Sequence, residues 1–344
     1  MTPERMAAIT GRYPGLRLAV IGDYCLDRYL DLDPTRAEIS IETGLPVRYV
    51  AQVRALPGGA GTVINNLVAL GVGAIHAVGF CGDDGEGFEL RRALSALPGV
   101  RLDHFLTTAA RRTFTYCKPM LPRPGAPARE LERLDSKNWT PTPPAVGAAM
   151  AAALRALAPV VDGVIVLDQV DLAESGVVTA EVRAELAALA AARPGLPVLA
   201  DSRRGLHGYP PVIFKMNAVE LGALTGTAGA AAGGGGVERA AAGLSAANSR
   251  PVFVTRAELG MVGAAPDGAV ATVAALPLRG PIDVVGAGDA VTANLTAALC
   301  AGAGLAEAME LAMLASSLVI HQLGTTGTAS VAEIRALSAR GALR

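Results

Sequence analysis

A glycine-rich segment near the C-terminal end of the chain combines backbone N–H groups with two carboxylates. It reads Asp283-Val-Val-Gly286-Ala287-Gly288-Asp289 and is followed by an apolar stretch typical of a helix. Glycines let N–H groups turn toward one point, and at a helix start such groups bind an anion. A phosphoryl group in transfer is such an anion. Asp289 follows the last glycine and could accept the proton of an attacking hydroxyl. The alternative is a glycine-rich turn with an N-capping Asp.

A second glycine-rich segment lies near the N-terminal end. Its sequence is Pro57-Gly58-Gly59-Ala60-Gly61-Thr62, with Asn65 and Asn66 just beyond. Glycines before a helix permit the backbone to contact a polar ligand. A tight turn between a strand and a helix explains the same residues, and for this segment alone it is the better explanation.

The composition excludes several classes of protein. Of the 344 residues, 51% are hydrophobic and 18% are charged, which is too apolar for a disordered chain. The net charge of −1 gives no reason to expect nucleic acid as a partner. The N-terminal segment lacks the apolar region of a signal peptide, and no run of about 18 residues has membrane character. We therefore expect a cytoplasmic protein that binds no membrane.

Neither cysteines nor histidines show the spacing of metal ligands. The four cysteines are Cys25, Cys81, Cys117 and Cys300, and the four histidines are His76, His104, His207 and His321. Few, scattered cysteines in a long chain fit a reduced, cytosolic protein. We expect buried thiols and assign no histidine to a metal.

Alternating strands and helices must position the glycine-rich segments. Short apolar runs predict buried strands at 16–22, 75–80, 163–167, 197–200, 212–215 and 252–255. Helices are predicted at 59–71, 83–97, 174–192 and 217–225. This alternation predicts an α/β fold with a doubly wound, mostly parallel sheet covered on both faces.

A separate small sheet is predicted to form a lid. Residues 45–56 alternate between apolar and polar, as a half-solvated strand would, and 111–121 and 130–134 look like further strands. We expect one domain over residues 1–344, with a lid built from about 31–57 and 101–136. The low-complexity segment 228–236 is expected to be a flexible surface connection rather than a phosphate loop.

Together, these features resemble the ribokinase-like (PfkB type) carbohydrate kinases. The stretch VIGDYCLDRY, residues 20–29, and the GGAG segment resemble the start of that family, and DVVGAGD resembles its D-x-x-G-A-G-D signature. Asn217-x-x-Glu220 matches N-x-x-E, and residues 254–260 resemble its V-T-x-x-x-x-G turn. The segment 321–327, which begins at His321, falls where the family closes over adenine. The motifs follow the family's order over about residues 16–335.

Three pieces are most similar to the heptose-7-phosphate kinases of the ADP-heptose pathway. They are GDYCLDRY (22–29), ETGLPVRYV (42–50) and LGTTGTASVAEI (323–334). The resemblance covers only the kinase half of those proteins, and no nucleotidyltransferase domain is expected here.

The resemblance implies a catalytic and nucleotide-binding set. Asp289 would be the base, and the backbone at Gly286, Ala287, Gly288 and Asp289 would form the anion hole. ATP would lie among Asn217, Glu220, Thr255, Gly260, Asp283 and Gly324. Mg²⁺ would be held through water by Glu220, and Asp283 would help to order it. A monovalent cation would also suit this family. A solvated helix carboxylate is the alternative explanation of Glu220.

The resemblance also implies an acceptor-binding set. Asp27 would bind sugar hydroxyls, and the backbone at Gly58 and Gly59 would approach the sugar. Asp23, Thr62 and Asn66 are further substrate-binding candidates, although an Asp at a strand end is more often a turn residue. Any of Arg111, Arg112, Arg203 and Arg204 could hold a phosphate already on the substrate. Exposed surface arginines are an equally good explanation of each.

Three positions depart from the family pattern. Val284 or Val285 stands where a Thr is usual, Thr62 stands where an Asn often binds hydroxyls, and Asn294 stands where a small residue is common. The change at Val285 would allow slow or specialised catalysis, and Thr62 leaves the identity of the sugar open.

We therefore predict ATP-dependent phosphorylation of a sugar or sugar phosphate, by a homodimer built through the lids. The alternatives are a nucleoside kinase and a non-catalytic protein that binds a sugar or nucleotide with the same fold. A dinucleotide oxidoreductase is excluded, because no G-x-G-x-x-G follows the first strand.

Overall fold

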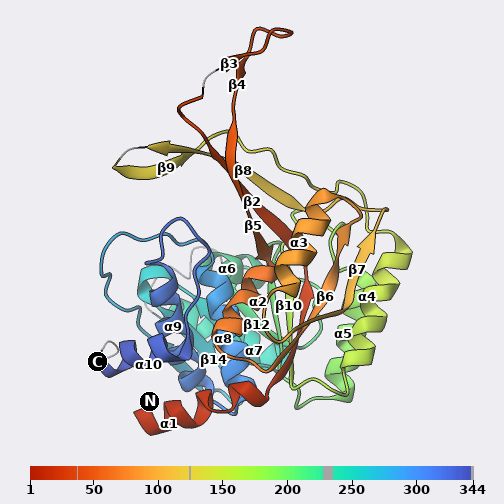
Figure 1. The fold of residues 1–344 in the computed structure, drawn as a ribbon. Coiled ribbons are helices and arrows are strands. Elements are labelled where there is room, and N and C mark those ends of the chain that lie inside the picture. Colours follow the sequence, from red (N-terminus) through yellow and green to blue (C-terminus); the bar gives the residue numbers. More distant parts are fainter. Residues whose placement is uncertain (37, 124, 228–234, 342–344) are drawn as a thin grey trace.

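The computed structural model describes residues 1–36, 38–123, 125–227 and 235–341. Of the predicted connection at 228–236, residues 228–234 lie outside the described part. A large sheet covered by helices on both faces forms the body, and a small sheet stands above one edge of it (Figure 1).

The large sheet has nine strands in the order β15-β14-β13-β12-β11-β10-β1-β6-β7. Seven of them run parallel: β1 (Arg17–Gly22), β6 (Ala74–Gly82), β7 (Val100–Thr108), β10 (Gly163–Asp168), β11 (Val198–Ser202), β12 (Ile213–Asn217) and β13 (Val252–Thr255). The edge strands β14 (Met261–Ala264) and β15 (Val270–Val273) are antiparallel. The six predicted buried strands are confirmed to within two residues at each end.

Helices cover both faces of this sheet. One face carries α1 (Pro3–Thr10), α2 (Ala60–Ala69), α3 (Gly85–Ser95), α8 (Ala287–Cys300), α9 (Leu305–Val319) and α10 (Val331–Ala339). The other carries α4 (Pro144–Leu157), α5 (Ala180–Ala192), α6 (Ala218–Thr225) and α7 (Gly236–Asn248). The helix predicted from residue 174 begins only at Ala180, where Thr179 accepts a hydrogen bond from the N–H of Val182.

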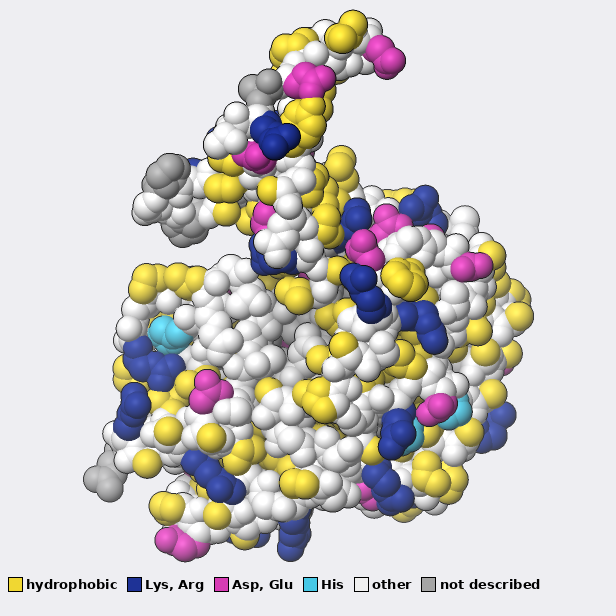
Figure 2. Space-filling model, in the orientation of Figure 1, with side chains coloured by type: hydrophobic (Ala, Val, Ile, Leu, Met, Phe, Trp, Pro, Cys, Tyr) yellow, Lys and Arg dark blue, Asp and Glu magenta, His cyan; other side chains and the backbone are white. Residues whose placement is uncertain are grey.

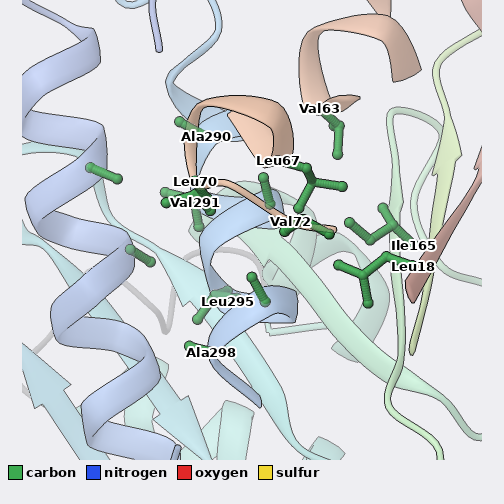
Figure 3. Close-up of a cluster of buried hydrophobic side chains, with 14 of the residues drawn as sticks. Leu18, Val63, Leu67, Leu70, Val72, Ile165, Ala290, Val291, Leu295 and Ala298 are labelled. Carbon is green, nitrogen blue, oxygen red and sulfur yellow. The ribbon is translucent and has the colours of Figure 1, made fainter. Parts of the chain in front are cut away.

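Two hydrophobic cores lie on opposite faces of the sheet, because successive side chains of a strand point to opposite sides. Along β1, Leu18 and Val20 belong to one core, and Ala19 and Ile21 belong to the other. In the first core, side chains of α2 and α8 pack together with those of β1 and β10 (Figure 3). This packing fixes the start of α8, which carries the glycine-rich segment.

The small sheet has the strand order β5-β2-β8-β9. Its strands are β2 (Tyr24–Leu32), β5 (Val50–Gly59), β8 (Thr115–Arg123) and β9 (Ala126–Glu130). Beyond it, the short pair β3 (Glu38–Ile39) and β4 (Pro46–Val47) forms an arm that projects away from the body (Figures 1 and 2).

The predicted lid boundaries need correction. Residues 100–108 form β7, which pairs in parallel with β6 in the large sheet, and the small sheet begins at Tyr24 rather than residue 31. A strand, a helix and a second strand in succession place the two strands parallel in one sheet. β7 is an edge strand with a single buried residue, Phe105, so it lacks the continuous apolar run that marks the central strands. The strand predicted at 130–134 lies at 126–130 instead.

In the described part of the chain, none of the helices is both long and apolar enough to span a membrane.

Candidate active site

The carboxyl ends of the parallel strands bring polar residues to one edge of the large sheet. Asp201 lies near the end of β11, Asn217 ends β12, and Thr255 ends β13. Open α/β sheets bind ligands outside this edge. The small sheet stands above the same edge (Figure 1) and adds Asp27 from β2 and Lys118 from β8.

The glycine-rich segment forms the start of α8. Gly286 is the N-cap and has a φ of 82°, a left-handed conformation that favours glycine, and an added Cβ would lie 3.3 Å from Thr326. The first N–H groups of a helix have no partner within it. The N–H groups of Gly288 and Asp289 are therefore available to an anion, whereas the N–H of Ala287, which was also predicted for the anion hole, donates to the Val284 carbonyl at 3.2 Å.

The carboxyl group of Asp289 is enclosed by protein, although the residue keeps some exposed surface. Burial raises its pKa to about 7. The positive charges of Lys215 and Arg203 lower this pKa, while the negative charges of Asp201 and Asp27 raise it. A carboxyl group near neutral pKa is suited to proton transfer.

Lys215 is a buried cation beside this helix start. Its Nζ lies 2.6 Å from Asp201 Oδ2, and a Cβ added to Gly288 would lie 3.3 Å from the same Nζ. The hydroxyl of Thr292, on α8, donates to the same Asp201 oxygen at 3.3 Å. Burial by itself would lower the pKa of Lys215, but the ion pair with Asp201 outweighs it and the pKa is raised.

Asp27 faces the site from the small sheet. Lys118 Nζ donates to Asp27 Oδ1 at 2.7 Å and lies 4.8 Å from the centre of the Tyr29 ring. A side chain on Gly58 would collide with Asp27 Oδ2, so the glycine leaves room for that carboxylate. The thiol of Cys25 lies close to the same glycine, and its pKa is raised by burial and then by Asp27.

Asp23 is a predicted substrate-binding residue, but its carboxylate accepts hydrogen bonds from the backbone of a neighbouring segment. Its Oδ2 accepts the N–H groups of Gln169 and Val170, and its Oδ1 accepts the N–H of Val177. Burial, followed by the charge of Asp168, raises its pKa to about 6, against the effect of the three backbone donors. Asp23 therefore holds the segment 169–177, and both of its oxygens are occupied by backbone.

The candidates Thr62 and Asn66 are buried in α2. Asn66 is 0% exposed, its Nδ2 donates to the Thr62 carbonyl at 3.0 Å, and its Oδ1 has no partner. Gly59 has a φ of 58°, and a side chain there would collide with the Asp23 carbonyl. Of the predicted acceptor set, Asp27 lies beside Gly58 and close enough to Asp289 for its charge to act there, whereas Thr62 and Asn66 are buried.

The predicted nucleotide set lies at the adjoining helix starts and loops. Asn217 and Glu220 form a capping box on α6: Asn217 Oδ1 accepts the Glu220 N–H, and Glu220 Oε2 accepts the Asn217 N–H at 2.7 Å. Asp283 accepts the N–H groups of Val285 and Gly324, and so joins the glycine-rich segment to the 321–327 segment.

Thr255 and Gly260 flank a turn between β13 and β14. The hydroxyl of Thr255 donates to the Met216 carbonyl at 3.4 Å. Gly260 has a φ of 88° and a side chain there would collide with the Val273 carbonyl. Gly260 is therefore required by the backbone itself, whatever the turn binds.

The structure separates the four candidate arginines. Arg111 is buried and donates to carbonyls of Thr140 and Ser175, and Arg204 binds the buried Asp168 at 2.8 Å. Arg112 contacts Asn138 through its backbone. Arg203 differs, because it contacts Tyr116 and its charge reaches Asp289.

A second cation accompanies Arg203. Lys137 Nζ lies 3.3 Å from Asp171 Oδ2, and Arg203 Nη1 lies 3.7 Å from the other oxygen of the same carboxylate. Lys137 also lies over the rings of Phe114 and Tyr116. Two cations thus share one exposed carboxylate on the acceptor side of Asp289.

A cavity of about 250 Å³ opens beside Asp23. Its walls are mostly apolar and aromatic, and they include Tyr24, Phe80, Phe114, Trp139, Val170 and Leu172. Lys137, Asn138 and Asp171 supply the polar groups. Trp139 is the single tryptophan of the chain and is 74% exposed.

The arrangement fits a metal ion whose ligands come mainly from the phosphate oxygens of the substrate. Over the described ranges, no group of three or more His, Cys, Asp or Glu side chains is placed to hold a metal by itself. Glu220 Oε1 makes no hydrogen bond there, and Asp201, Asp289 and Glu220 outnumber the buried cation Lys215. Mg²⁺ keeps several waters and needs only one or two carboxylates beside phosphate oxygens.

Lys215, Asp201 and Lys118 were not among the predicted site residues. One signal in the sequence could have found Lys215: it interrupts the otherwise apolar strand VIFKM, where an unpaired lysine would be costly. Lys118 had no such signal, since its partner Asp27 is 91 residues away.

Comparisons with known proteins agree with this geometry. Residues 182–332 match the model of the family described as pfkB family carbohydrate kinase. "Bifunctional protein HldE" of Azorhizobium caulinodans is 35% identical over 332 residues, which cover 94% of this chain and 65% of that protein. The chain therefore spans less than two thirds of the length of this curated relative.

Two solved structures share the fold. Ribokinase of Arabidopsis thaliana, in complex with ribose and ATP, has a TM-score of 0.67 and 19% identity, covering 94% of this chain and 98% of that one. Phosphofructokinase-2 of Escherichia coli, in complex with fructose-6-phosphate, has a TM-score of 0.66 and 16% identity, covering 94% and 99%. The predicted ribokinase-like fold with a doubly wound sheet is confirmed.

Proposed function

We propose that the chain is a carbohydrate kinase of the pfkB family, whose model its residues 182–332 match, and that it transfers the terminal phosphoryl group of ATP to a hydroxyl group of a sugar phosphate. The observation that carries the proposal is the place of Asp289. It lies in the first turn of α8, next to free N–H groups and close enough to Asp27 for their charges to interact.

In this proposal the reaction uses groups of the chain for binding, orientation and proton transfer. Asp27, fixed by Lys118, accepts hydrogen bonds from the acceptor, and Asp289 removes the proton of the reacting hydroxyl. The acceptor oxygen bonds to phosphorus as the bond between phosphorus and the ADP oxygen breaks. The N–H groups of Gly288 and Asp289 bind the charged oxygens of the group in transfer.

ATP would extend from this hole along Asn217, Glu220 and Asp283 toward the loops at Thr255, Gly260 and Gly324. Glu220 would bind Mg²⁺ through water, with Asp283 ordering the loop beside it. Mg²⁺ supplies charge neutralisation of the phosphate oxygens when bound. A monovalent cation near Asp283 is a further element of this proposal.

The acceptor phosphate would bind at Arg203 and Lys137. Their shared partner Asp171 is 62% exposed, so a phosphate can replace it without leaving a buried carboxylate unpaired. Guanidinium groups match phosphate oxygens in pairs. Heptose 7-phosphate is the first acceptor to test, because the resembling segments 22–29, 42–50 and 323–334 favour it.

The test is a coupled assay of ADP release with Mg-ATP against free sugars, sugar phosphates including heptose 7-phosphate, and nucleosides. Activity with one sugar phosphate and with no free sugar would support the proposal. Activity with free sugars alone would contradict the proposed binding site for the acceptor phosphate at Arg203 and Lys137. Silence across the panel while ATP still binds would favour the non-catalytic alternative.

A nucleoside acceptor is the second candidate, and the cavity beside Asp23 is the observation in its favour. Its aromatic walls, Tyr24, Phe80, Phe114 and Trp139, suit a planar base. Lys137, which lines the cavity, and Arg203, which shares Asp171 with it, favour a phosphate instead. If the assay gives more activity with nucleosides than with sugar phosphates, the acceptor is a nucleoside whose base binds in this cavity.

We further propose that two copies associate through the small sheets. The arm exposes Ile39 by 58%, Ile41 by 99% and Leu45 by 64%, and Val50 and Val53 of β5 are also exposed (Figure 2). Apolar side chains gathered on a projecting segment mark an interaction site. Light scattering at micromolar concentration should give twice the mass of the chain, and a monomer would contradict the proposal.

We also propose a cytoplasmic location. The free thiols at all four cysteines are consistent with it.

A further inference from the structure

The ammonium group of Lys215 stands at the positive end of a helix, where a cation is normally destabilising. The N-terminus of α8 carries a partial positive charge from its aligned peptide dipoles. Lys215 Nζ nevertheless lies beside Gly288, 3.3 Å from the place of a Cβ built on that residue, within the first turn of that helix. Lys215 and the start of α8 thus present positive charge to the same place, where the carboxylates Asp201, Asp289 and Glu220 offset it.

Asp201 supplies only part of that partner. Its Oδ2 lies 2.6 Å from Lys215 Nζ, and the same oxygen accepts the Thr292 hydroxyl. An ammonium group has three donors. Within the residues that the structure describes, Asp201 is its one hydrogen-bond partner, so two donors are left for another acceptor.

The neighbouring carboxylates do not fill this role by hydrogen bonding. Asp289 and Glu220 interact with Lys215 through charge, and Glu220 already caps α6. Arg203 adds a second cation on the acceptor side of Asp289. The unused donors of Lys215 and the free N–H groups at the start of α8 are therefore left for an anion that binds between them.

We propose that Lys215 is a further catalytic residue, whose ammonium group binds the phosphoryl group in transfer together with the N–H groups of Gly288 and Asp289. Asp201 is its positioning residue. This inference rests on the proposed kinase function and adds a cation that acts on the terminal phosphate of ATP and not on ADP. A charge placed in advance costs no reorganisation during the reaction.

The experiment compares the binding of two nucleotides by calorimetry, without any acceptor. A non-hydrolysable ATP analogue carries the terminal phosphate and ADP lacks it, and both are used with Mg²⁺. Lys215→Met, which keeps the length and removes the charge, should weaken binding of the analogue at least tenfold and change ADP binding less than twofold. Lys215→Arg, which keeps the charge, should recover part of the loss.

The control is Arg204→Met, which removes the cation of a second ion pair with a buried carboxylate, Asp168. It should lower the melting temperature and leave the ratio of analogue to ADP affinity unchanged. A folded Lys215→Met protein whose two affinities are unchanged, or fall equally, would overturn the proposal and leave Lys215 as a structural ion pair.

If Lys215→Met does not fold, Lys215→Gln replaces it, because an amide can still donate to Asp201. The same ratio of affinities decides the outcome. In a substrate assay, the neutral variants should lose turnover at least a hundredfold with the acceptor KM changed less than threefold. If no acceptor is found, the proposed function fails. The ratio of the affinities for the ATP analogue and for ADP still decides whether Lys215 binds the terminal phosphate.

Discussion

The backbone N–H of Val177 donates a 2.7 Å hydrogen bond to Asp23 Oδ1, across a sequence separation of 154 residues. Asp23 directly follows β1, and Val177 ends the segment that leads from β10 toward α5. Through this bond and those from Gln169 and Val170, one carboxylate fixes a segment that also carries Asp171 and part of the aromatic cavity. Asp23 therefore shapes the acceptor side through the backbone, which uses three of the roughly four accepting positions of its carboxylate.

Replacing Asp23 by Asn should loosen the segment 169–177. The amide offers one accepting oxygen, and its NH₂ group would face a backbone donor. A buried donor without a partner costs about 1–3 kcal/mol, so we expect a loss of about 2 kcal/mol in the free energy of unfolding, measured with urea. Hydrogen exchange at Gln169, Val170 and Val177 should speed up. Asp103→Asn, at an exposed position of β7, serves as the control and should change neither.

Asp289→Asn should fold normally and lose turnover by at least about a hundredfold, the scale of a lost general base. Its stability carries a second signature. The folded-state pKa of about 7 lies above the ordinary value of 3.8, so the folded protein loses stability as pH rises between these values. At pH 8 the variant should melt no lower than the unsubstituted protein. Normal turnover would remove Asp289 from its proposed role.

The pH dependence of kcat/KM should report the same group. Asp289 must be ionised to accept a proton, so kcat/KM should fall as pH drops below about 7. Lys215, Arg203, Asp201, Asp27 and the Cys25 thiol are the charged or titratable groups that act on it. A profile that stays level down to pH 5 would show that the base is a different group.

Arg203→Ala should raise the KM for a phosphorylated acceptor and leave the KM for ATP unchanged. A hydrogen bond to a charged group contributes about 1.5–3 kcal/mol, which corresponds to roughly tenfold to hundredfold in affinity. Arg112→Ala is a matched control, since Arg112 is exposed and contacts Asn138 only through its backbone. An equal rise in KM for both variants would mean that Arg203 has no specific contact with the acceptor.

The sequence by itself determined the parallel body of the fold and the place of the glycine-rich helix start. Strands such as Gly163–Asp168 are buried along their whole length, so their apolar runs are visible without knowledge of their neighbours. The glycines at the start of α8 and the pair Asn217 and Glu220 act within one turn of a helix. Their spacing along the chain is therefore also their spacing in space.

Only the tertiary structure decided which side chains meet across long separations. Lys118 reaches Asp27, Lys215 reaches Gly288, and Asp23 reaches Val177 because strands from distant parts of the chain become neighbours. The same holds for the arginines, of which Arg111 and Arg204 bind protein groups while Arg203 remains beside Asp289. It also holds for β7, whose alternating exposure is equally compatible with a lid and with the edge of a large sheet. Local pattern fixes the type of an element, but its partners depend on contacts that no local pattern contains.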